Sequence, residues 1–145
     1  IRELVDFKPQ SKKTNIDEAL KYLSNVMTKK AIVFVLSDFI DFSYEQTLKI
    51  AGKKHDITGI RVYDQFDETI PNLGLVPMLD AETGIVTLAN TGSKKVRNAY
   101  AENSRATKIF YENAFRKSGS GFLSTRVDES YVKKLLGYFK QKGGN

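Results

Sequence analysis

An uninterrupted apolar run that ends on a carboxylate constrains the fold of this chain more than any other feature of the sequence. Residues 31–37 (AIVFVLS) show no alternation of apolar and polar positions, and Asp38 follows directly. Such a run is typical of a parallel strand that is covered on both faces and lies centrally in its sheet. Because the carboxyl ends of parallel strands border the ligand crevice of an open α/β sheet, Asp38 is a candidate site residue.

Helical patterns lie on both sides of this run. Apolar residues recur at helical spacing over residues 16–27, and Thr14 followed by Asp17 forms a capping-box-like start. Ser43 is expected to cap a second helix that ends near His55. A strand between two amphipathic helices is typical of a parallel α/β layer.

The rest of the sequence continues the alternation of strands and helices. We expect a strand over residues 57–63, a long helix that begins at Ser93, a strand over residues 122–127 and a last helix capped by Asp128. The face predicted to be buried on the long helix comprises Val96, Ala99, Asn103, Ala106 and Phe110. Three visible parallel strands predict a partial doubly wound, Rossmann-like α/β fold.

The chain is expected to form a single domain, or a fragment of one, over residues 1–145. Residues 75–88 predict an inserted β-hairpin, because two apolar segments flank a turn sequence that contains Gly84. Residues 143–145 are expected to fray. The chain begins with Ile rather than Met, which favours a piece of a longer protein.

Composition narrows the classes of function. A net charge of +6 with 41% hydrophobic and 28% charged residues fits one ordinary soluble domain. The lysines are scattered instead of forming one block, so we expect a solvated surface and no nucleic-acid binding. The absence of Cys excludes disulfides and thiolate ligands, and no apolar run has the roughly 20 residues that span a bilayer. These features favour a cytoplasmic protein.

Two oxygen-bearing side chains are candidate ligands of a hard divalent cation. Thr14 lies in the loop that opens the first helix, and Asp38 ends the apolar run. Mg²⁺ and Ca²⁺ take about six or more oxygen ligands, so these two residues alone would hold an ion weakly. A structural role is open to each, because Thr14 is a good N-cap and Asp38 could cap the following turn. Asp41 is a candidate for the outer shell, and His55 has no second His or Cys to form a zinc site.

Several short motifs, taken in order, resemble those of a known bacterial family. They comprise residues 14–20 (TNIDEAL), 35–41 (VLSDFID), 61–64 (RVYD) and 80–84 (DAETG), with Ser124-Thr125 and Tyr131-Val132 near the end. Their order and spacing over nearly the whole chain resemble the bacterial domain of unknown function fifty-eight family. That family is similar to the von Willebrand factor type A domain, a doubly wound α/β fold.

The resemblance implies a metal-ion-dependent adhesion site, of which this chain holds a part. In type A domains the ligands come from an Asp-x-Ser-x-Ser loop, a threonine in a later loop and an aspartate that ends the fourth strand. Thr14 matches the threonine and Asp38 the aspartate, whereas no Asp-x-Ser-x-Ser occurs in this sequence. The chain therefore resembles the C-terminal half of the domain. Mg²⁺ is expected in the intact protein and is not expected to bind this fragment tightly.

The resemblance favours a non-enzymatic protein-interaction domain. It implies that Mg²⁺ captures a partner's carboxylate and that a MoxR-type AAA ATPase works beside the protein in the assembly of complexes. Two alternatives stay open: a metal-dependent phosphoryl-transfer enzyme that uses Asp38, and a basic nucleic-acid-binding module.

The same resemblance bears on oligomeric state. In the type A strand order the first strand lies beside the fourth, so residues 31–37 would become an edge strand in this fragment. An apolar edge with unpaired backbone groups is a template for pairing with another chain. We therefore expect a homodimer through this strand.

Overall fold

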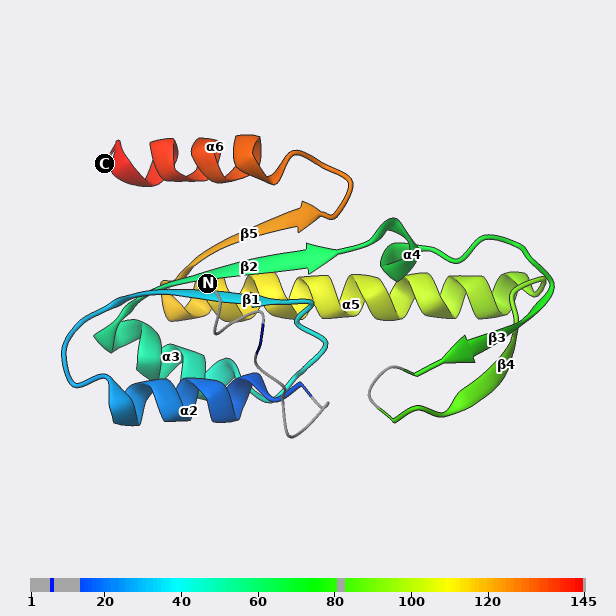
Figure 1. Ribbon diagram of the computed structural model, residues 1–145, viewed down its shortest axis with the longest axis horizontal. Coiled ribbons are helices and arrows are strands. Elements are labelled where there is room, and N and C mark those ends of the chain that lie inside the picture. The colour runs from blue at the N-terminus through cyan, green and yellow to red at the C-terminus, as the bar shows by residue number, and fades with distance from the viewer. Residues whose placement is uncertain (1–5, 7–13, 81–82, 145) are drawn as a thin grey trace.

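The computed structural model describes residue 6, residues 14–80 and residues 83–144, so part of the hairpin turn and residue 145 of the predicted tail lie outside it. Helices and strands alternate, and a hairpin lies at one end (Figure 1). In chain order the elements are α2 (Ile16–Val26), β1 (Ile32–Ser37), α3 (Glu45–Lys54), β2 (Asp56–Tyr63), α4 (Gln65–Glu68), β3 (Leu75–Leu79), β4 (Val86–Asn90), α5 (Lys94–Ser118), β5 (Gly121–Arg126) and α6 (Tyr131–Gly143).

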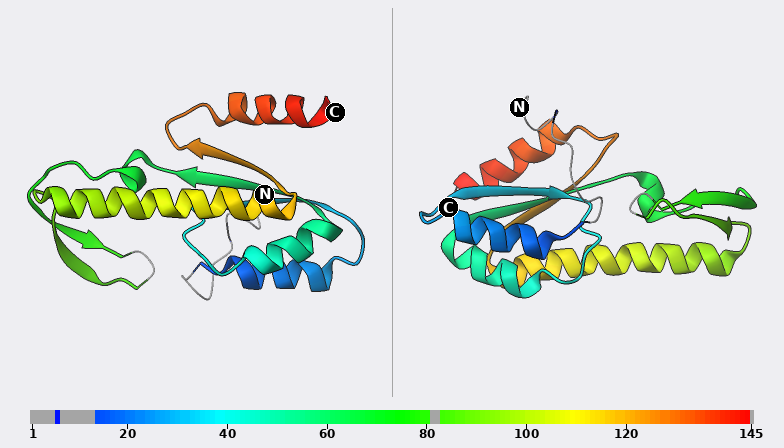
Figure 2. Two further views of the ribbon diagram at one scale, coloured as in Figure 1. Left: turned by 180° about the vertical axis from the view of Figure 1, so that it is seen from behind. Right: turned by 60° about the horizontal axis from the view of Figure 1, so that its bottom comes forward.

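Three parallel strands form the main sheet, in the order β1-β2-β5. Ile32 of β1 pairs with Asp56 of β2, and Gly59 of β2 pairs with Phe122 of β5. Helices α2, α3 and α5 cover one face of this sheet, and α6 lies over the other (Figure 2). The predicted α/β class, with a narrow parallel sheet and helices on both faces, is confirmed.

Strand β1 lies at an edge among the described strands. This position confirms what the resemblance implied for this fragment and corrects the central position that the uninterrupted apolar run predicted. The residues of β1 alternate between exposed and half-buried positions, so the prediction that both faces of the strand are covered is wrong. Val33 and Val35 pack against the core, whereas Ile32 is 71% exposed. The physical reason is that α2 and the core lie on one face of β1 only. On the other face Phe34 contacts Phe139 of α6 edge to face and is still 46% exposed.

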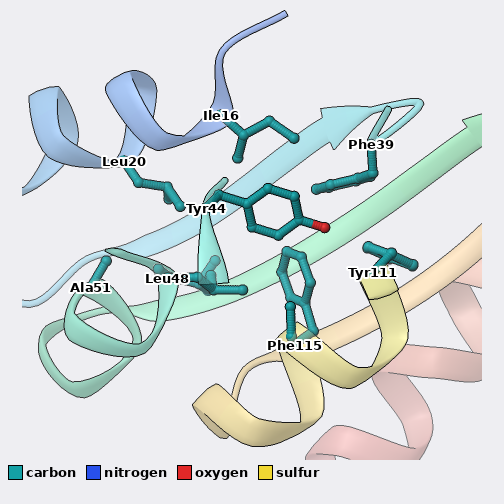
Figure 3. Packing of buried hydrophobic residues seen from close by; sticks show 10 residues of the cluster. Ile16, Leu20, Phe39, Tyr44, Leu48, Ala51, Tyr111 and Phe115 are labelled. Atoms are coloured by element: carbon teal, nitrogen blue, oxygen red, sulfur yellow. The ribbon is translucent and has the colours of Figure 1, made fainter. Parts of the chain in front are cut away.

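The core lies between the sheet and the helices α2, α3 and α5 (Figure 3). Phe39, Tyr44, Tyr111 and Phe115 form its aromatic centre, and the ring centroids of Phe39 and Tyr111 are 4.4 Å apart. The Tyr111 hydroxyl donates to the carbonyl oxygen of Gly59 at 2.9 Å, and burial raises the pKa of this phenol. Fully burying one aromatic side chain contributes roughly 1.5–3 kcal/mol, so this cluster is a major source of stability.

The N-terminus of α2 corrects the first predicted cap. The residue before the helix is Asn15, whose side-chain oxygen accepts a hydrogen bond of 2.9 Å from the backbone N–H of Glu18. Thr14 is therefore not the cap. Asn and Thr are both good caps, and the sequence pattern alone did not separate two adjacent candidates.

The predicted caps of α3 and α6 are also wrong. Tyr44 precedes α3 and Ser130 precedes α6, and neither side chain makes a capping hydrogen bond. The Ser43 hydroxyl donates instead to Asp41, and the Asp128 carboxylate accepts from Arg126 at the end of β5. Such local partners compete with capping. The predicted end of the second helix is confirmed, since His55 is the C-cap of α3.

The face predicted to be buried on α5 is mostly wrong, since of its residues only Phe110 packs against the core. The buried residues of the helix are Thr107, Tyr111, Ala114 and Phe115, all in the C-terminal half. The N-terminal half extends beyond the main sheet toward the hairpin, so the predicted stripe there has no sheet to pack against (Figure 1). Neither α5 nor any other described helix combines the length and the apolar composition that a membrane span requires.

Strands β3 and β4 pair antiparallel and confirm the hairpin predicted over residues 75–88. Thr91 closes its base, because its hydroxyl donates to the Gly74 carbonyl oxygen at 2.8 Å and accepts from the Leu73 N–H at 2.9 Å. Most apolar side chains of the hairpin are exposed. Arg97 of α5 donates to the Thr91 carbonyl oxygen, so the base of the hairpin, and not burial of its strands, connects it to the fold.

Candidate binding site at the carboxyl end of the sheet

Asp38 lies directly after β1, at the carboxyl end of the sheet, as predicted. Its Oδ1 accepts hydrogen bonds from the Ser37 hydroxyl and the Ile40 backbone N–H, each at 3.2 Å. The carboxylate thus caps the turn. The next residue, Phe39, has a φ of 59°, which is uncommon for a residue other than Gly. Its ring is fully buried, and this burial holds the turn that presents Asp38.

Asp41 joins the loop after β1 to helix α2. Its Oδ2 accepts from the backbone N–H of Ile16 at 2.9 Å, and its Oδ1 accepts from the backbone N–H of Ser43 at 2.8 Å. Burial opposes ionisation of Asp41, but the hydrogen bonds from Ser43 and Ile16 outweigh it and lower the pKa of the carboxyl below its ordinary value. Asp41 therefore acts as a clamp between the β1–α3 loop and α2.

The structure places Thr14 and Asp38 on different hollows of the surface. Thr14 borders an apolar groove of about 610 Å³ between α2 and β1. Asp38 borders a polar cavity of about 140 Å³ between the end of the sheet and α5. Within residues 14–80 and 83–144, no group of three or more His, Cys, Asp or Glu side chains could hold a metal ion. A site that joins Thr14 to Asp38 stays a prediction, and it needs further ligands.

The polar cavity collects side chains from several elements. It is lined by Asp38 and Ile40 after β1, Arg61 and Tyr63 of β2, Asp67 of α4, and Tyr100, Asn103, Ser104 and Thr107 of α5. The register of the sheet pairs Ser37 with Arg61, which brings the end of β1 beside the cation. The arrangement combines one buried guanidinium with two exposed carboxylates, and it suits a charged or strongly polar ligand.

Arg61 is the first of the candidate site residues that the sequence did not predict. It is 3% exposed and lies on the central strand of the described sheet. A signal for it was present, because Arg61 is flanked by β-branched residues, Ile60 and Val62, within the predicted strand. Arginine is almost never fully buried without a partner.

Asp67 was missed because α4 was not predicted. Asp64 and Asp67 form a reciprocal capping box around this short helix. The Asp67 Oδ2 accepts from the backbone N–H of Asp64 at 2.7 Å, which orients Asp67 at the border of the cavity. A capping box is a readable sequence signal, although four helical residues are too few for a hydrophobic period.

The open edge of β1 lies between two apolar hollows. One is the groove beside α2, and the other is a cavity of about 310 Å³ between the sheet and α6. Leu36 borders both, and it is 65% exposed. This side of the molecule therefore offers apolar surface and a strand edge together.

Comparison with known families identifies the one to which this chain belongs. The family described as Protein of unknown function DUF58 matches residues 1–109, and the chain is a member of it. This finding confirms the family to which the sequence motifs pointed.

Two mycobacterial proteins are similar in sequence to this chain. Uncharacterized protein MAV169 of Mycobacterium avium is 24% identical over 135 residues, which cover 92% of this chain and 79% of that protein. Uncharacterized protein Rv1480 of Mycobacterium tuberculosis is 22% identical over 129 residues, which cover 88% of this chain. The chain spans 40% of the length of Rv1480.

A solved structure resembles this chain distantly. It is the crystal structure of conserved hypothetical protein BatB from Bacteroides thetaiotaomicron, with a TM-score of 0.42 and 17% sequence identity. The match covers 96% of this chain and 63% of that chain. A likeness of this degree carries no argument about function.

Proposed function

We propose that this chain belongs to a non-enzymatic protein-interaction domain. The open edge of β1 carries the proposal. In the described sheet this apolar strand pairs with β2 alone, and apolar hollows flank it on both faces. Unpaired strand edges and uncovered apolar surface both favour association with another polypeptide.

The outward backbone groups of β1 can be assigned from the ladder. The backbone N–H of Asp56 donates to the Ala31 carbonyl oxygen at 2.9 Å, so alternate residues from Ala31 onward direct their groups toward β2. Ile32, Phe34 and Leu36 therefore direct their N–H and C=O groups outward. A partner strand would bond at these residues, whose side chains are also exposed.

The partner we propose for this edge is a second copy of the chain. Two β1 strands related by a two-fold axis would pair antiparallel and join two three-stranded sheets. A specific interface of this kind is expected to bury at least about 1,000 Å² in total. The exposed apolar side chains of β1 would be buried in this interface.

Phe34→Pro tests this pairing, because Pro removes an outward N–H without removing a bond to β2. Phe34→Ala is the matched control, since it removes the same ring and keeps the N–H. Sedimentation equilibrium should show a dimer for the unmodified chain, a weaker dimer for Phe34→Ala and a monomer for Phe34→Pro. A monomeric unmodified chain would rule out the dimer, and equal dimerisation of all three would place the contact elsewhere.

We further propose that the intact protein uses a Mg²⁺-dependent adhesion site in which Thr14 and Asp38 are ligands. Family membership and the position of Asp38 at the carboxyl end of the sheet support this proposal. Bound Mg²⁺ would attract a carboxylate of a protein partner, and a MoxR-type AAA ATPase is the partner we propose for complex assembly.

Calorimetric titration of this chain tests the metal site. We expect only weak Mg²⁺ binding, because two of about six oxygen ligands come from these residues. Asp38→Ala should then change the titration little. Sub-micromolar Mg²⁺ binding that disappears in Asp38→Ala would contradict the proposal that this chain holds only part of the metal site.

One observation favours a second candidate function, phosphoryl transfer at Asp38. Asp38 and Asp67 border the same cavity as Arg61, and an aspartyl-phosphate enzyme needs a nucleophilic carboxylate with polar groups that stabilise the phosphoryl oxygens. In such a step an Asp38 oxygen attacks the phosphorus of acetyl phosphate, and acetate leaves. A mass increase of one phosphoryl group with Mg²⁺ and acetyl phosphate, lost in Asp38→Asn, would replace the interaction proposal by this one.

A further inference from the structure

Arg61 is a buried cation with two nitrogen atoms that have no hydrogen-bond partner among the described residues. It is 3% exposed, and among the described residues neither its Nε nor its Nη1 has a hydrogen-bond partner. No ion pair joins it to a carboxylate of residues 14–80 or 83–144. The ring of Tyr63 lies beside the guanidinium, with 4.5 Å between the guanidinium carbon and the ring centroid.

This arrangement is unfavourable unless another group meets the cation. Leaving a buried donor unsatisfied lowers stability by about 1–3 kcal/mol, and by more when the group is charged. The contact with Tyr63 contributes about 0.5–2 kcal/mol, which does not offset two unmatched nitrogens. Arginine stays protonated in proteins, so the charge cannot be removed by titration. An unmatched buried cation that borders a cavity therefore indicates an anion-binding site.

The cavity beside Arg61 has room for the end of a side chain. Its volume is about 140 Å³, which is four to five times the roughly 30 Å³ that one water molecule takes in the liquid. Arg61 and the 3% exposed Thr107 line it from the buried side. Asp38 and Asp67 are exposed and border it from the solvent side. The cation is thus buried, and the two carboxylates are exposed.

We propose that this cavity binds the carboxylate of an Asp or Glu side chain presented by a partner polypeptide, with Arg61 as the cation that receives it. A carboxylate accepts charge-assisted hydrogen bonds from guanidinium N–H groups. Asp38 and Asp67 would repel a doubly charged phosphate more strongly than a singly charged carboxylate. Their oxygens can also accept the backbone N–H groups that flank an acidic side chain. Asp38 borders this cavity and is also a ligand of the proposed metal site, but binding of a carboxylate to Arg61 needs no divalent cation.

N-acetyl-glutamate amide is the probe for this site, because it carries one side-chain carboxylate between two peptide groups. N-acetyl-glutamine amide is its uncharged control, and inorganic phosphate is the third ligand. Each is titrated into the 145-residue chain with a chelator present, while NMR follows the Nε–H resonance of Arg61. The glutamate probe should shift this resonance saturably, and the other two ligands should bind at least about tenfold more weakly.

Two substitutions at Arg61 and one elsewhere complete the test. Arg61→Met is expected to weaken the glutamate probe by at least about tenfold and to raise the thermal midpoint, because an unmatched cation is no longer buried. Arg61→Lys keeps the charge, loses the planar set of donors and should weaken the probe as well. Arg116→Met is the matched control and should change neither quantity. Arg116 is exposed and also lies near an aromatic ring, 5.6 Å from the centroid of Phe122.

Four results would overturn the proposal. They are the absence of a saturable shift with the glutamate probe, equal affinity of Arg61→Met and the unmodified chain, tighter binding of phosphate than of the glutamate probe, and a lower thermal midpoint in Arg61→Met. The last would show that the folded chain satisfies this cation by itself. The chelator removes Mg²⁺ from these titrations, so the result at Arg61 does not depend on whether the adhesion site binds Mg²⁺. The two proposals can therefore fail separately.

Discussion

Strands β1 and β2 lie side by side, yet the more hydrophobic of the two, β1, is the less buried. β1 reads IVFVLS and has no buried residue, whereas β2 reads DITGIRVY and buries five consecutive residues, 57–61. β2 has a neighbouring strand on each edge, and in the described sheet β1 has one. The place of a strand in the sheet, and not its apolar content, thus decides its burial. The apolar content that β1 leaves uncovered favours a partner.

Two buried polar residues of the central strand β2, Thr58 and Arg61, differ in whether their polar groups have partners. The Thr58 hydroxyl lies 3.2 Å from the Tyr138 hydroxyl of α6, so this buried group is matched. Arg61 on the opposite face has two unmatched nitrogens among the described residues. The first residue is part of the packing, and the second is better explained by a ligand.

The largest expected effect compares the same substitution on the two strands. Ile57→Ala on β2 should lower the free energy of unfolding by about 2–5 kcal/mol, because Ile57 is 1% exposed and its removal leaves a cavity. Ile32→Ala on β1 should change it by less than about 0.5 kcal/mol, because Ile32 is 71% exposed. Urea denaturation measures both. Both variants are measured at protein concentrations below the dimer dissociation constant, where β1 is not covered by a partner. Similar losses of free energy under these conditions would contradict the exposure of β1.

A smaller effect tests why β2 can lie so close to α5. A Cβ at Gly59 would come 2.5 Å from the ring of Phe115, which is fully buried and has no room to move. Gly59→Ala should therefore destabilise the fold by about 1–3 kcal/mol through overpacking. Gly137→Ala on α6 is the control and should stabilise by about 0.5–1 kcal/mol, since nothing lies within 4 Å of its Cβ position. Chemical denaturation of both variants gives the sign, and a stable Gly59→Ala would contradict the close approach.

The smallest effect concerns how β1 is held without burial. Asp41→Ala removes the clamp from the loop after β1 to Ile16 of α2 and should destabilise by about 1–2 kcal/mol. Asp38→Ala should be milder, because the bonds of Asp38 stay within its own turn.

The pH dependence of the same clamp has a definite sign. The pKa of Asp41 is lowered in the folded chain, so its contribution is present above the unfolded pKa of about 3.9 and is lost as the pH falls through the folded value. Thermal unfolding of the unmodified chain and of Asp41→Ala should therefore converge in strong acid. A difference in midpoint that persists there would assign the effect of Asp41 to packing rather than to its charge.

Prediction from sequence succeeded where the signal is local. The runs 31–37 and 57–63 became β1 and β2 within one residue at their starts, and the hairpin followed from two apolar segments around a turn. Local patterns failed where two neighbouring residues compete for one role. Asn15 rather than Thr14 caps α2, and only the backbone geometry of the helix end separates them.

The candidate site was predicted in part for the same reason. Asp38 was placed correctly, because the end of an apolar strand is visible in the sequence. Arg61, Asp67 and Thr107 were not, since they come from three further elements that meet only through the register of the sheet and the packing of α5.

The sequence by itself determined the class of fold, the hairpin, the position of Asp38 and, apart from the cap of α2 and the short α4, the order of the strands and described helices, since each follows from residues close together in the chain. The tertiary structure alone decided that β2 is central in the described sheet, which residues of α5 are buried, and that Arg61 lines a cavity. These properties depend on which neighbours cover each segment. Such neighbours lie far away in the sequence, and hydrophobic burial acts on surface area whatever residue supplies the cover.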